Sequence, residues 1–262
     1  MNFSFTEQDN ISKKRSIEIC KNIPTSPIDN YLEEIILDSA FYSIIADNGD
    51  NIDNVIGYFA INGGCCLSQF YIDSNNLKYG TSIFESILSQ FPVKYGLVAT
   101  CDELFMSHAV DQYKSIYKQG FFFEDTSIII PEAELYPAQL ELAAIEDIAY
   151  IMEISGGFFD DLSQRIPRDE IFIFIDDDIL LGCGIIIRNK ITTGYASIGM
   201  FVNEDYRMRG VGKTIIYRLR RWCHNNNLIP VSGCWYYNTS SKRTLESAGM
   251  VTKTRLLRFN FI

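Results

Sequence analysis

A short run of basic residues and glycines in the last third of the chain has the composition of an anion-binding loop. Its centre is Arg-x-x-Gly-x-Gly, from Arg207 to Gly212, and Lys213 and Thr214 follow it. Glycine carries no Cβ, so the backbone at Gly210 and Gly212 can turn tightly and come close to a ligand. The amphipathic helix expected from about Gly212 offers unpaired N–H groups and the positive end of its dipole. The pattern predicts a phosphate-binding site where a strand ends and a helix begins.

Two other phosphate loops are excluded by single positions. Gly-Val-Gly-Lys-Thr is similar to the end of Gly-x-x-x-x-Gly-Lys-Thr, a loop of nucleoside triphosphatases, but the first glycine of that motif falls on Arg207. The dinucleotide fingerprint Gly-x-Gly-x-x-Gly requires a glycine where Ile215 stands. A surface turn before an ordinary helix is the alternative that needs no ligand.

A second landmark follows the next expected strand. Asn238, Ser241, Gly249 and Met250 have the spacing of an Asn, a small residue three positions later, and Gly-Phe at positions eleven and twelve, with Met in place of Phe. Together with the strand, the glycine loop and the helix, this landmark resembles the GCN5-related N-acetyltransferases (GNAT). The pattern around Asn238 is similar to the zwittermicin-resistance acetyltransferases within that superfamily.

The resemblance implies that acetyl-CoA is the cosubstrate, bound by a strand end, the glycine loop and the next strand end. Asn238 is at the same time a good N-cap for the helix that follows it. With only two histidines and no Cys-x-x-Cys, the chain has no recognisable metal site, and we expect none. The residues expected to contact acetyl-CoA are Met200, Phe201, Val202, Arg207, Met208, Arg209, Gly210, Val211, Gly212, Lys213, Thr214, Asn238 and Ser241.

The usual catalytic residues of the family are absent. Many members have a tyrosine seven residues after the Asn, where this chain has Leu245, and many have a Glu on the strand before the loop, where 195–200 holds no carboxylate. The reaction needs a base for the ammonium and an acid for the departing thiolate. A packed tyrosine or a solvated carboxylate is the ordinary alternative for each candidate. The candidates are Tyr236 and Tyr237 as the acid, and Glu153, Asp160 or Asp161 as the base.

The order of expected elements occurs twice along the chain. Gly80 precedes Gly210 by 130 positions, and Gly120 precedes Gly249 by 129. A repeat of this length indicates duplicated domains rather than a solenoid. We therefore predict an α+β tandem GNAT fold with halves 1–130 and 131–262, each a mixed, mostly antiparallel sheet flanked by helices, so that the chain has two sheets.

In this overlay the first half lacks the polar features of the second. Opposite Arg207, Gly212 and Asn238 it has Leu77, Ser82 and Ala109. The overlay predicts a degenerate first half that binds no acyl-CoA and a catalytic second half.

Hydrophobic periodicity and turn residues give the elements of each half. In the first half we expect helices over 27–39, 81–91 and 103–119, strands over 41–46, 55–62, 66–72 and 95–100, a turn at 48–50, and a hairpin of 120–123 with 127–130. In the second half we expect strands over 139–143, 170–175, 179–187, 196–202, 230–236 and 253–261, and helices over 144–154, from 212, and over 240–248. The helix from 212 is expected to bury Ile215, Ile216, Leu219, Trp222 and Cys223 and to leave Arg218, Arg220 and Arg221 outside.

Composition limits the remaining possibilities. The 262 residues are 47% hydrophobic with a net charge of −10, which argues against nucleic acid as a partner. No apolar run is long enough to span a membrane, the N-terminus does not look like a signal peptide, and seven scattered cysteines fit a reducing cytoplasm. We expect a cytoplasmic monomer or homodimer that transfers an acetyl group from acetyl-CoA to a primary amine of a small molecule or peptide. A non-catalytic acyl-CoA-binding or sensing protein is the alternative, and an aminoacyl-tRNA-dependent transferase is a third, less favoured one.

Overall fold

The last strand of the chain determines how the strands are connected. The computed structural model describes residues 2–47, 54–177 and 179–261. Within them the strands are hydrogen-bonded in the order β1-β2-β3-β4-β5-β12-β6-β11-β10-β9-β8-β7. The mixed fold with flanking helices is confirmed, but the prediction of two sheets is wrong, because β12 (Met250–Asn260) pairs with β5 and places all strands in one sheet.

The chain forms two compact units, which we call unit 1 and unit 2 and describe separately. Unit 1 comprises residues 1–120 and 254–262, and unit 2 comprises 121–253. The units differ from the predicted halves, 1–130 and 131–262, in two segments: 121–130 belongs to unit 2, and the tail 254–262 belongs to unit 1.

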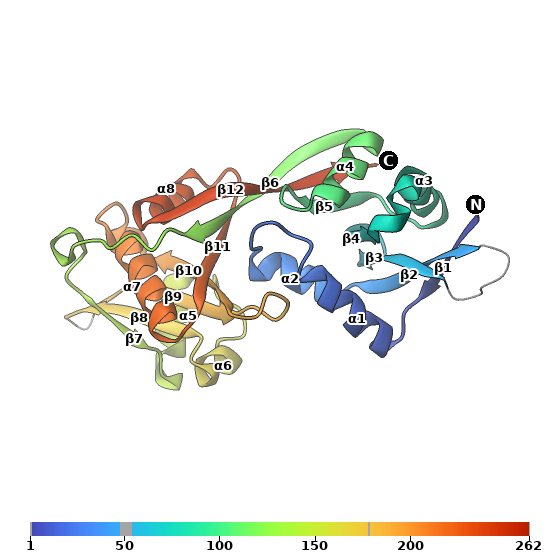
Figure 1. Ribbon diagram of the computed structural model, residues 1–262. Helices are drawn as coiled ribbons and strands as arrows, with labels where there is room; N and C mark the ends of the chain where they lie inside the picture. The colour runs from blue at the N-terminus through green and yellow to red at the C-terminus, as the bar shows by residue number, and fades with distance from the viewer. Residues whose placement is uncertain (1, 48–53, 178, 262) are drawn as a thin grey trace. The chain divides into compact units, whose positions relative to one another are not determined.

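Unit 1 contains a mixed sheet with helices packed on it (Figure 1): β1 to β4 are antiparallel, β4 and β5 are parallel, and the end of β12 is antiparallel to β5. Strand β6 begins in this unit and continues into unit 2. The elements are β1 (Asn2–Glu7), α1 (Asn10–Cys20), α2 (Asn30–Leu37), β2 (Ala40–Asp47), β3 (Val55–Asn62), β4 (Cys66–Ile72), the 3-10 helix η1 (Ser74–Tyr79), α3 (Gly80–Gln90), β5 (Tyr95–Ala99), α4 (Glu103–Gln112) and β6 (Ser115–Asp125).

Unit 2 repeats this order of elements. Its helix α7, which follows β10, is longer than α3, which follows β4 in unit 1. Helix α7 packs on β9, β10 and β11, while α5 and α6 pack on the other face of the sheet against β8, β9 and the end of β10. The elements are η2 (Glu132–Glu134), β7 (Gln139–Leu142), η3 (Ile145–Asp147), α5 (Ile148–Ser155), α6 (Leu162–Arg165), η4 (Ile166–Arg168), β8 (Ile171–Asp176), β9 (Ile179–Arg188), β10 (Tyr195–Val202), η5 (Glu204–Tyr206), α7 (Val211–Asn225), β11 (Ile229–Trp235), α8 (Thr239–Ser247) and β12.

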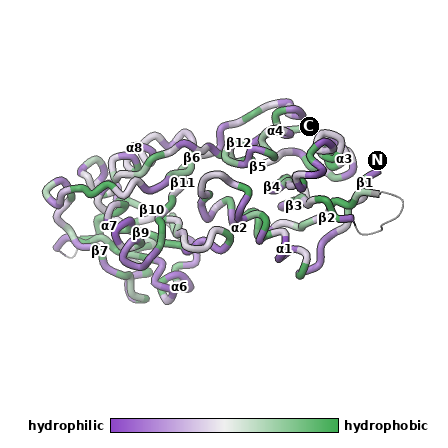
Figure 2. Tube along the Cα trace, in the orientation of Figure 1, coloured by the Kyte–Doolittle hydropathy of each residue, from purple (hydrophilic) through white to green (hydrophobic). Residues whose placement is uncertain are grey.

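The apolar pattern of each strand and helix explains its burial. Strands β8 and β9 are almost wholly apolar and lie among the green stretches in Figure 2. Along α7 the residues Ile215, Ile216, Leu219 and Cys223 have no exposed surface, as the helical spacing predicts.

Arg220, by contrast, is buried, which corrects the prediction that it lies outside. Its Nε donates to Asp125 Oδ1 at 2.6 Å, and its Nη1 donates to the carbonyl of Ala248. His224 Nε2 lies 2.6 Å from the other oxygen of Asp125. A buried guanidinium is tolerated when it is paired and hydrogen-bonded. Helical periodicity considers α7 alone and therefore does not predict the pairing of Arg220 with Asp125, which lies far away in the sequence.

Three further expectations for unit 1 are corrected. β1 and α1 were not expected, because their polar sequences show neither the apolar alternation of a strand nor the apolar spacing of a helix clearly. The helix expected over 103–119 ends at Gln112, since the chain turns extended at Tyr113 and enters β6. The hairpin of 120–123 with 127–130 does not form, because β6 lies between β12 and β11 and Ser127 has a positive φ. The turn at 48–50 falls outside the described residues.

Asp102 carries a titratable carboxyl group into the interior of unit 1. Its side chain is 3% exposed, and its Oδ1 accepts a hydrogen bond from the Phe105 N–H at 3.1 Å, which caps α4. Burial raises the pKa of Asp102 to about 6, because removing the carboxylate from water disfavours its charged form. Burial also raises the pKa of Asp29, the N-cap of α2, to about 7.

The first prediction concerns the stability of unit 1. The pKa of Asp102 is higher in the folded state than in the unfolded state. The contribution of its neutral carboxyl group to stability is therefore fully present below about pH 4 and is lost as the pH rises through about 6. Asp102→Asn keeps an oxygen for the cap and removes the charge. We expect it to raise the free energy of unfolding by roughly 1–3 kcal/mol at about pH 7.5 and by much less at about pH 4.

Urea unfolding at both pH values measures this difference. The matched control is Asp111→Asn, an exposed position on the same helix, which should change stability by less than about 0.5 kcal/mol. An equal effect of Asp102→Asn at both pH values would contradict the assignment of the charge as the destabilising factor.

Candidate functional site

Two parallel strands in unit 2 part after three residue pairs. β10 and β11 are paired at Tyr195 with Ile229, Ala196 with Pro230, and Ser197 with Val231. Both strands then continue, β10 to Val202 and β11 to Trp235. The other edge of β10 stays paired with β9 as far as Val202 opposite Gly182. The edge of β10 that faces β11 is therefore not paired with β11 beyond Ser197, and we call the interval between the two strands from there onward the strand opening.

A buried hydroxyl lies at the point where the strands part. Ser232 is 2% exposed, and its Oγ donates to the Ile198 carbonyl at 2.7 Å. A parallel ladder would offer that carbonyl a backbone N–H. The serine side chain takes the place of this donor and satisfies a buried acceptor. The strands are thus held in the parted arrangement by a specific bond.

The glycine loop continues directly from the end of β10. Arg207 Nε donates to the Val202 carbonyl at 3.2 Å, and its Nη1 pairs with Glu204 at 2.9 Å. Arg207 therefore fastens the loop to the strand. The next residues turn through left-handed backbone, with φ of 62° at Met208 and 86° at Gly210.

The N-terminus of α7 has the features of an anion site. Gly210 is the N-cap and supplies no capping side chain. The first helical bond runs from the Thr214 N–H to the Gly210 carbonyl at 3.0 Å, so the N–H groups of the three residues before Thr214 precede the first helical bond. Such groups, together with the helix dipole, bind phosphate.

The two glycines of the motif are required for different reasons. A Cβ on Gly210 would meet no atom within 4 Å, so glycine is favoured there by its positive φ. A Cβ on Gly212 would lie 3.0 Å from Thr244 Cγ2 and 3.2 Å from Val202 Cγ2. Gly212 is therefore required by close packing of α7 against α8 and β10, whereas the sequence suggested close approach of a ligand.

The other residues of the loop and of the first turn of α7 differ in their exposure to solvent. Met208 is 98% exposed, and the Arg209 guanidinium lies 5.2 Å from the ring centre of Tyr206. Lys213 Nζ lies 3.3 Å from Glu134 Oε2. Thr214 is fully buried.

The hydroxyl of Thr214 is used within the protein. It donates to the Gly210 carbonyl at 3.1 Å and accepts from the Tyr136 N–H at 2.8 Å. Among the residues expected to contact acetyl-CoA, Thr214 is thus placed to hold the loop, not to face a ligand.

The second landmark lies at the open end of β11. Asn238 Oδ1 accepts from the Ser241 N–H at 3.0 Å, which confirms its interpretation as the N-cap of α8. The side chain of Asn238 is exposed, and its amide N–H groups are not used in this cap. Contact of Asn238 and Ser241 with acetyl-CoA stays a prediction.

The two candidate tyrosines follow β11 directly. The Tyr236 ring stacks on Phe121, with centroids 4.6 Å apart and planes at 8°, and meets Tyr237 edge-on at 5.3 Å. Tyr237 is 66% exposed. Both tyrosines therefore lie where the strand opening ends, and Tyr237 has its ring in solvent. Leu245, at the position of the usual family tyrosine, is buried among apolar residues.

The candidate carboxylates lie on or after α5, on the face of the sheet opposite α7. Glu153 is exposed on α5, and Asp161 is exposed in the turn after it. Asp160 is paired with Arg165 at 2.9 Å. This ion pair makes Asp160 the weakest candidate for a base.

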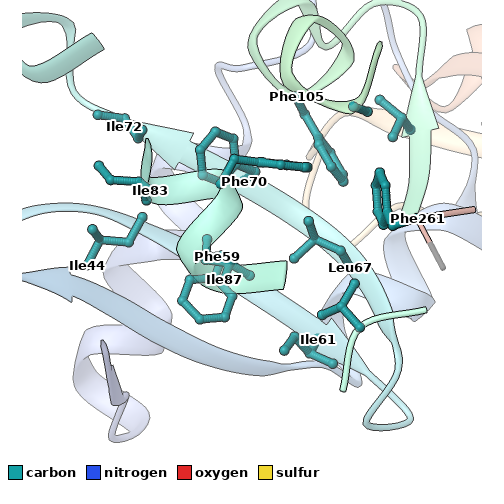
Figure 3. Close-up of a cluster of buried hydrophobic side chains, with 14 of the residues drawn as sticks. Ile44, Phe59, Ile61, Leu67, Phe70, Ile72, Ile83, Ile87, Phe105 and Phe261 are labelled. Carbon is teal, nitrogen blue, oxygen red and sulfur yellow. The ribbon is translucent and has the colours of Figure 1, made fainter. Parts of the chain in front are cut away.

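Unit 1 contains the same parting of strands, but its interior is filled. β4 and β5 are parallel and are paired only at Cys66 with Tyr95 and Leu67 with Gly96. Phe70, beyond the last pair, has no exposed surface and lies 5.0 Å from the ring of Phe84. Figure 3 shows Phe70 with Phe105 and Phe261 in this cluster. The corresponding residues Met200 to Val202 of β10 are half-exposed.

The structure corrects which residues of the two units correspond. The N-cap of α4 is Asp102, three residues after β5, as Asn238 is three residues after β11, so Asp102 and not Ala109 stands opposite Asn238. A Cβ on Gly80 would lie 2.4 Å from His108 Nε2, just as one on Gly212 would meet Thr244. Gly80 thus corresponds to Gly212 and not to Gly210.

These correspondences show what unit 1 lacks. Its 3-10 helix η1 runs straight into α3, and the backbone at Gly80 is right-handed helical. There is no counterpart of the left-handed turn at Met208 and Gly210 in η1 or at the start of α3. The ring of His108 lies against the start of α3, where unit 2 has the smaller Thr244.

The comparisons with known proteins agree with this architecture. Residues 13–126 match the model of an acetyltransferase (GNAT) domain, and residues 138–250 match that of the acetyltransferase (GNAT) family. A search of curated proteins found no match to the sequence. Within the described residues no helix is long and apolar enough to cross a bilayer, and no three His, Cys, Asp or Glu side chains are grouped to hold a metal ion.

Solved structures share the fold along almost the whole chain. A GNAT-family acetyltransferase from Colwellia psychrerythraea has a TM-score of 0.86 at 16% identity, covering 99% of this chain and 100% of its own. A GCN5-related N-acetyltransferase from Sphaerobacter thermophilus has a TM-score of 0.65 at 12% identity, covering 99% and 96%. A tandem GNAT protein from the clavulanic acid biosynthesis pathway has a TM-score of 0.59 at 11% identity, covering 98% of each chain.

The second prediction concerns the hydroxyl at the parting point. Ser232→Ala removes the donor to a buried carbonyl, so we expect the free energy of unfolding to fall by about 1–3 kcal/mol. Urea unfolding measures the change, with Ser240→Ala, an exposed serine at the start of α8, as the matched control. Equal stability of Ser232→Ala and the wild type would show that the strands part without this bond.

Proposed function

Because the chain belongs to the GNAT superfamily of acetyltransferases, with two such domains in tandem, we propose that it is an acetyl-CoA-dependent N-acetyltransferase. Unit 2 transfers the acetyl group to a primary amine of a small molecule or peptide. The observation that carries this proposal is the strand opening of unit 2, which ends beside the anion site of α7.

The residues of unit 2 fit the two halves of the cosubstrate. The N–H groups at the start of α7, with Arg209 and Lys213 nearby, suit the pyrophosphate. The edge of β10 from Met200 to Val202 offers backbone groups that suit the amides and thioester carbonyl of the pantetheine arm. The amide group of Asn238 suits the same arm from the side of β11.

The reaction requires one bond to form and one to break. The neutral amine attacks the thioester carbon, the C–N bond forms, and the C–S bond then breaks to release the CoA thiolate. A backbone N–H of the β10 edge stabilises the charge that develops on the carbonyl oxygen. The substrate ammonium first loses one proton to Glu153 or Asp161 directly or through water. The nitrogen loses its second proton to water after the C–N bond has formed, and the thiolate takes a proton from Tyr237 or Tyr236, which solvent re-protonates.

Unit 1 has a different part in this proposal. Phe70 is buried where unit 2 has the half-buried Met200, and η1 enters α3 without the left-handed turn, so we propose that unit 1 binds no acyl-CoA. Its tail strand comes from the end of the chain, so unit 1 is completed only when unit 2 has been made. On composition we place the protein in the cytoplasm, as a monomer or homodimer with no nucleic-acid or membrane partner.

The third prediction concerns the cosubstrate. Isothermal titration should show one acetyl-CoA per chain. Gly212→Glu should abolish binding by adding bulk and negative charge at the start of α7. Arg209→Glu changes charge at an exposed side chain without the packing change, and we expect it to weaken binding roughly 10- to 100-fold.

The matched control is Ser82→Glu, which places the same charge in the first turn of α3 in unit 1. It should leave affinity unchanged. Undiminished affinity in both unit 2 variants, or weakened affinity in Ser82→Glu, would move the site away from α7.

The fourth prediction concerns the proton donor. If Tyr237 protonates the thiolate, Tyr237→Phe should lower kcat roughly 10²- to 10⁴-fold with little change in the Kd for acetyl-CoA. Tyr236→Phe should cost less, because its ring is stacked on Phe121. Full activity of both variants would leave water as the acid.

A further inference from the structure

Three phenylalanine rings meet at the open end of β10, and one of them is left in solvent. Phe201 lies beyond the last β10–β11 pair and turns to the α5–α6 face of the sheet. Phe159 is buried and lies 6.5 Å from Phe201 between ring centroids. Phe158 is 61% exposed, although it lies 5.0 Å from the ring of Phe159 and 5.6 Å from that of Phe201. We call Phe158 and Phe201 the phenyl pair.

The chain holds Phe158 in this exposed position through its backbone. Helix α5 ends in two left-handed glycines, with φ of 58° at Gly156 and 79° at Gly157, and Asp161 has φ of 50°. Arg165, which is largely buried, pairs with Asp160 at 2.9 Å and with Glu170 at 3.1 Å. These ion pairs tie the turn to the start of β8. The exposed ring is thus the product of a defined turn.

An exposed ring in this place forgoes the free energy that burial of a phenyl group supplies. Phe159, the next residue along the chain, is buried, so the turn can place a ring inside. Phe201 lies on β10, the strand whose edge is proposed to hold the thioester, and Phe158 packs against it from the turn after α5. A flat apolar group that covers Phe158 there would bring an attached amine toward the reacting carbonyl.

The other strand of the opening also ends in exposed aromatic side chains. Trp235, the last residue of β11, is 53% exposed, and Tyr237 is 66% exposed, with their ring centroids 6.1 Å apart. The end of β11 therefore carries rings that solvent reaches, and the end of β10 carries the half-buried Phe201 with the exposed Phe158 packed against it.

We propose that the amine acceptor carries an aromatic ring, which the phenyl pair receives. The inference rests on the proposed function and names its substrate class: a primary amine joined to a flat apolar group by a short linker. Aromatic rings recognise one another by offset or edge contacts, as the phenyl pair itself shows. The acceptor ring takes the exposed face of Phe158.

The test compares matched amines with the full-length protein. 2-Phenylethylamine, butylamine and spermidine are each offered with acetyl-CoA, and thiol release and acetylated product are both measured. We expect kcat/KM for 2-phenylethylamine to exceed that for butylamine at least about tenfold. Phe158→Ala should remove most of this preference and leave butylamine nearly unchanged, whereas Phe158→Tyr should keep it.

The control variant is Ile145→Ala, which removes an exposed apolar side chain elsewhere in unit 2 and should alter neither rate. Transfer to butylamine or spermidine without preference for the aromatic amine would overturn this inference and leave the proposed function intact. An equal loss with all amines in Phe158→Ala would also overturn it. No transfer to any amine would overturn the proposed function itself.

Discussion

The parting of β10 from β11 is the constraint on which the rest of unit 2 depends. Two parallel strands that separate leave backbone N–H and C=O groups without partners, and such groups must find other donors and acceptors. At the parting point Ser232 supplies a hydroxyl to the Ile198 carbonyl. Beyond it, the free edge of β10 is able to bind an amide-rich ligand. Arg207 holds the loop to the end of β10, and the loop leads into the start of α7.

The two units show that parted strands alone do not make a site. In unit 1 the same parting is present, but Phe70 and its neighbours fill it, and η1 enters α3 without a left-handed turn. Unit 2 keeps Met200 to Val202 half-exposed and inserts Met208 and Gly210 in left-handed backbone before the helix. The two copies thus differ in side-chain volume at one strand and in the backbone of one loop, and our proposal that only unit 2 binds acyl-CoA rests on these two differences.

Local patterns in the sequence predicted most elements and the position of the loop. The spacing of apolar residues predicted α7, and the glycines of the motif predicted the turn before it. Both predictions depend only on residues that are close together in the chain. Long-range pairing was not predictable in this way: β12 joins β5 across the chain, and Arg220 is buried because Asp125 reaches it. The fixed-offset overlay likewise matched Asn238 to Ala109, since it could not show that the loop and helix lengths differ between the units. The role of Gly212 in helix packing needed Thr244 and Val202 in place.

The central claim is that acyl-CoA binds along β10 and the start of α7 and nowhere in unit 1. Hydrogen–deuterium exchange of the full chain, with and without saturating acetyl-CoA, tests it most directly because it reads the backbone N–H groups themselves. The account predicts slowed exchange in peptides covering 198–214 and no change in peptides covering 66–90. Slowed exchange over 66–90, or unchanged exchange over 198–214, would contradict it.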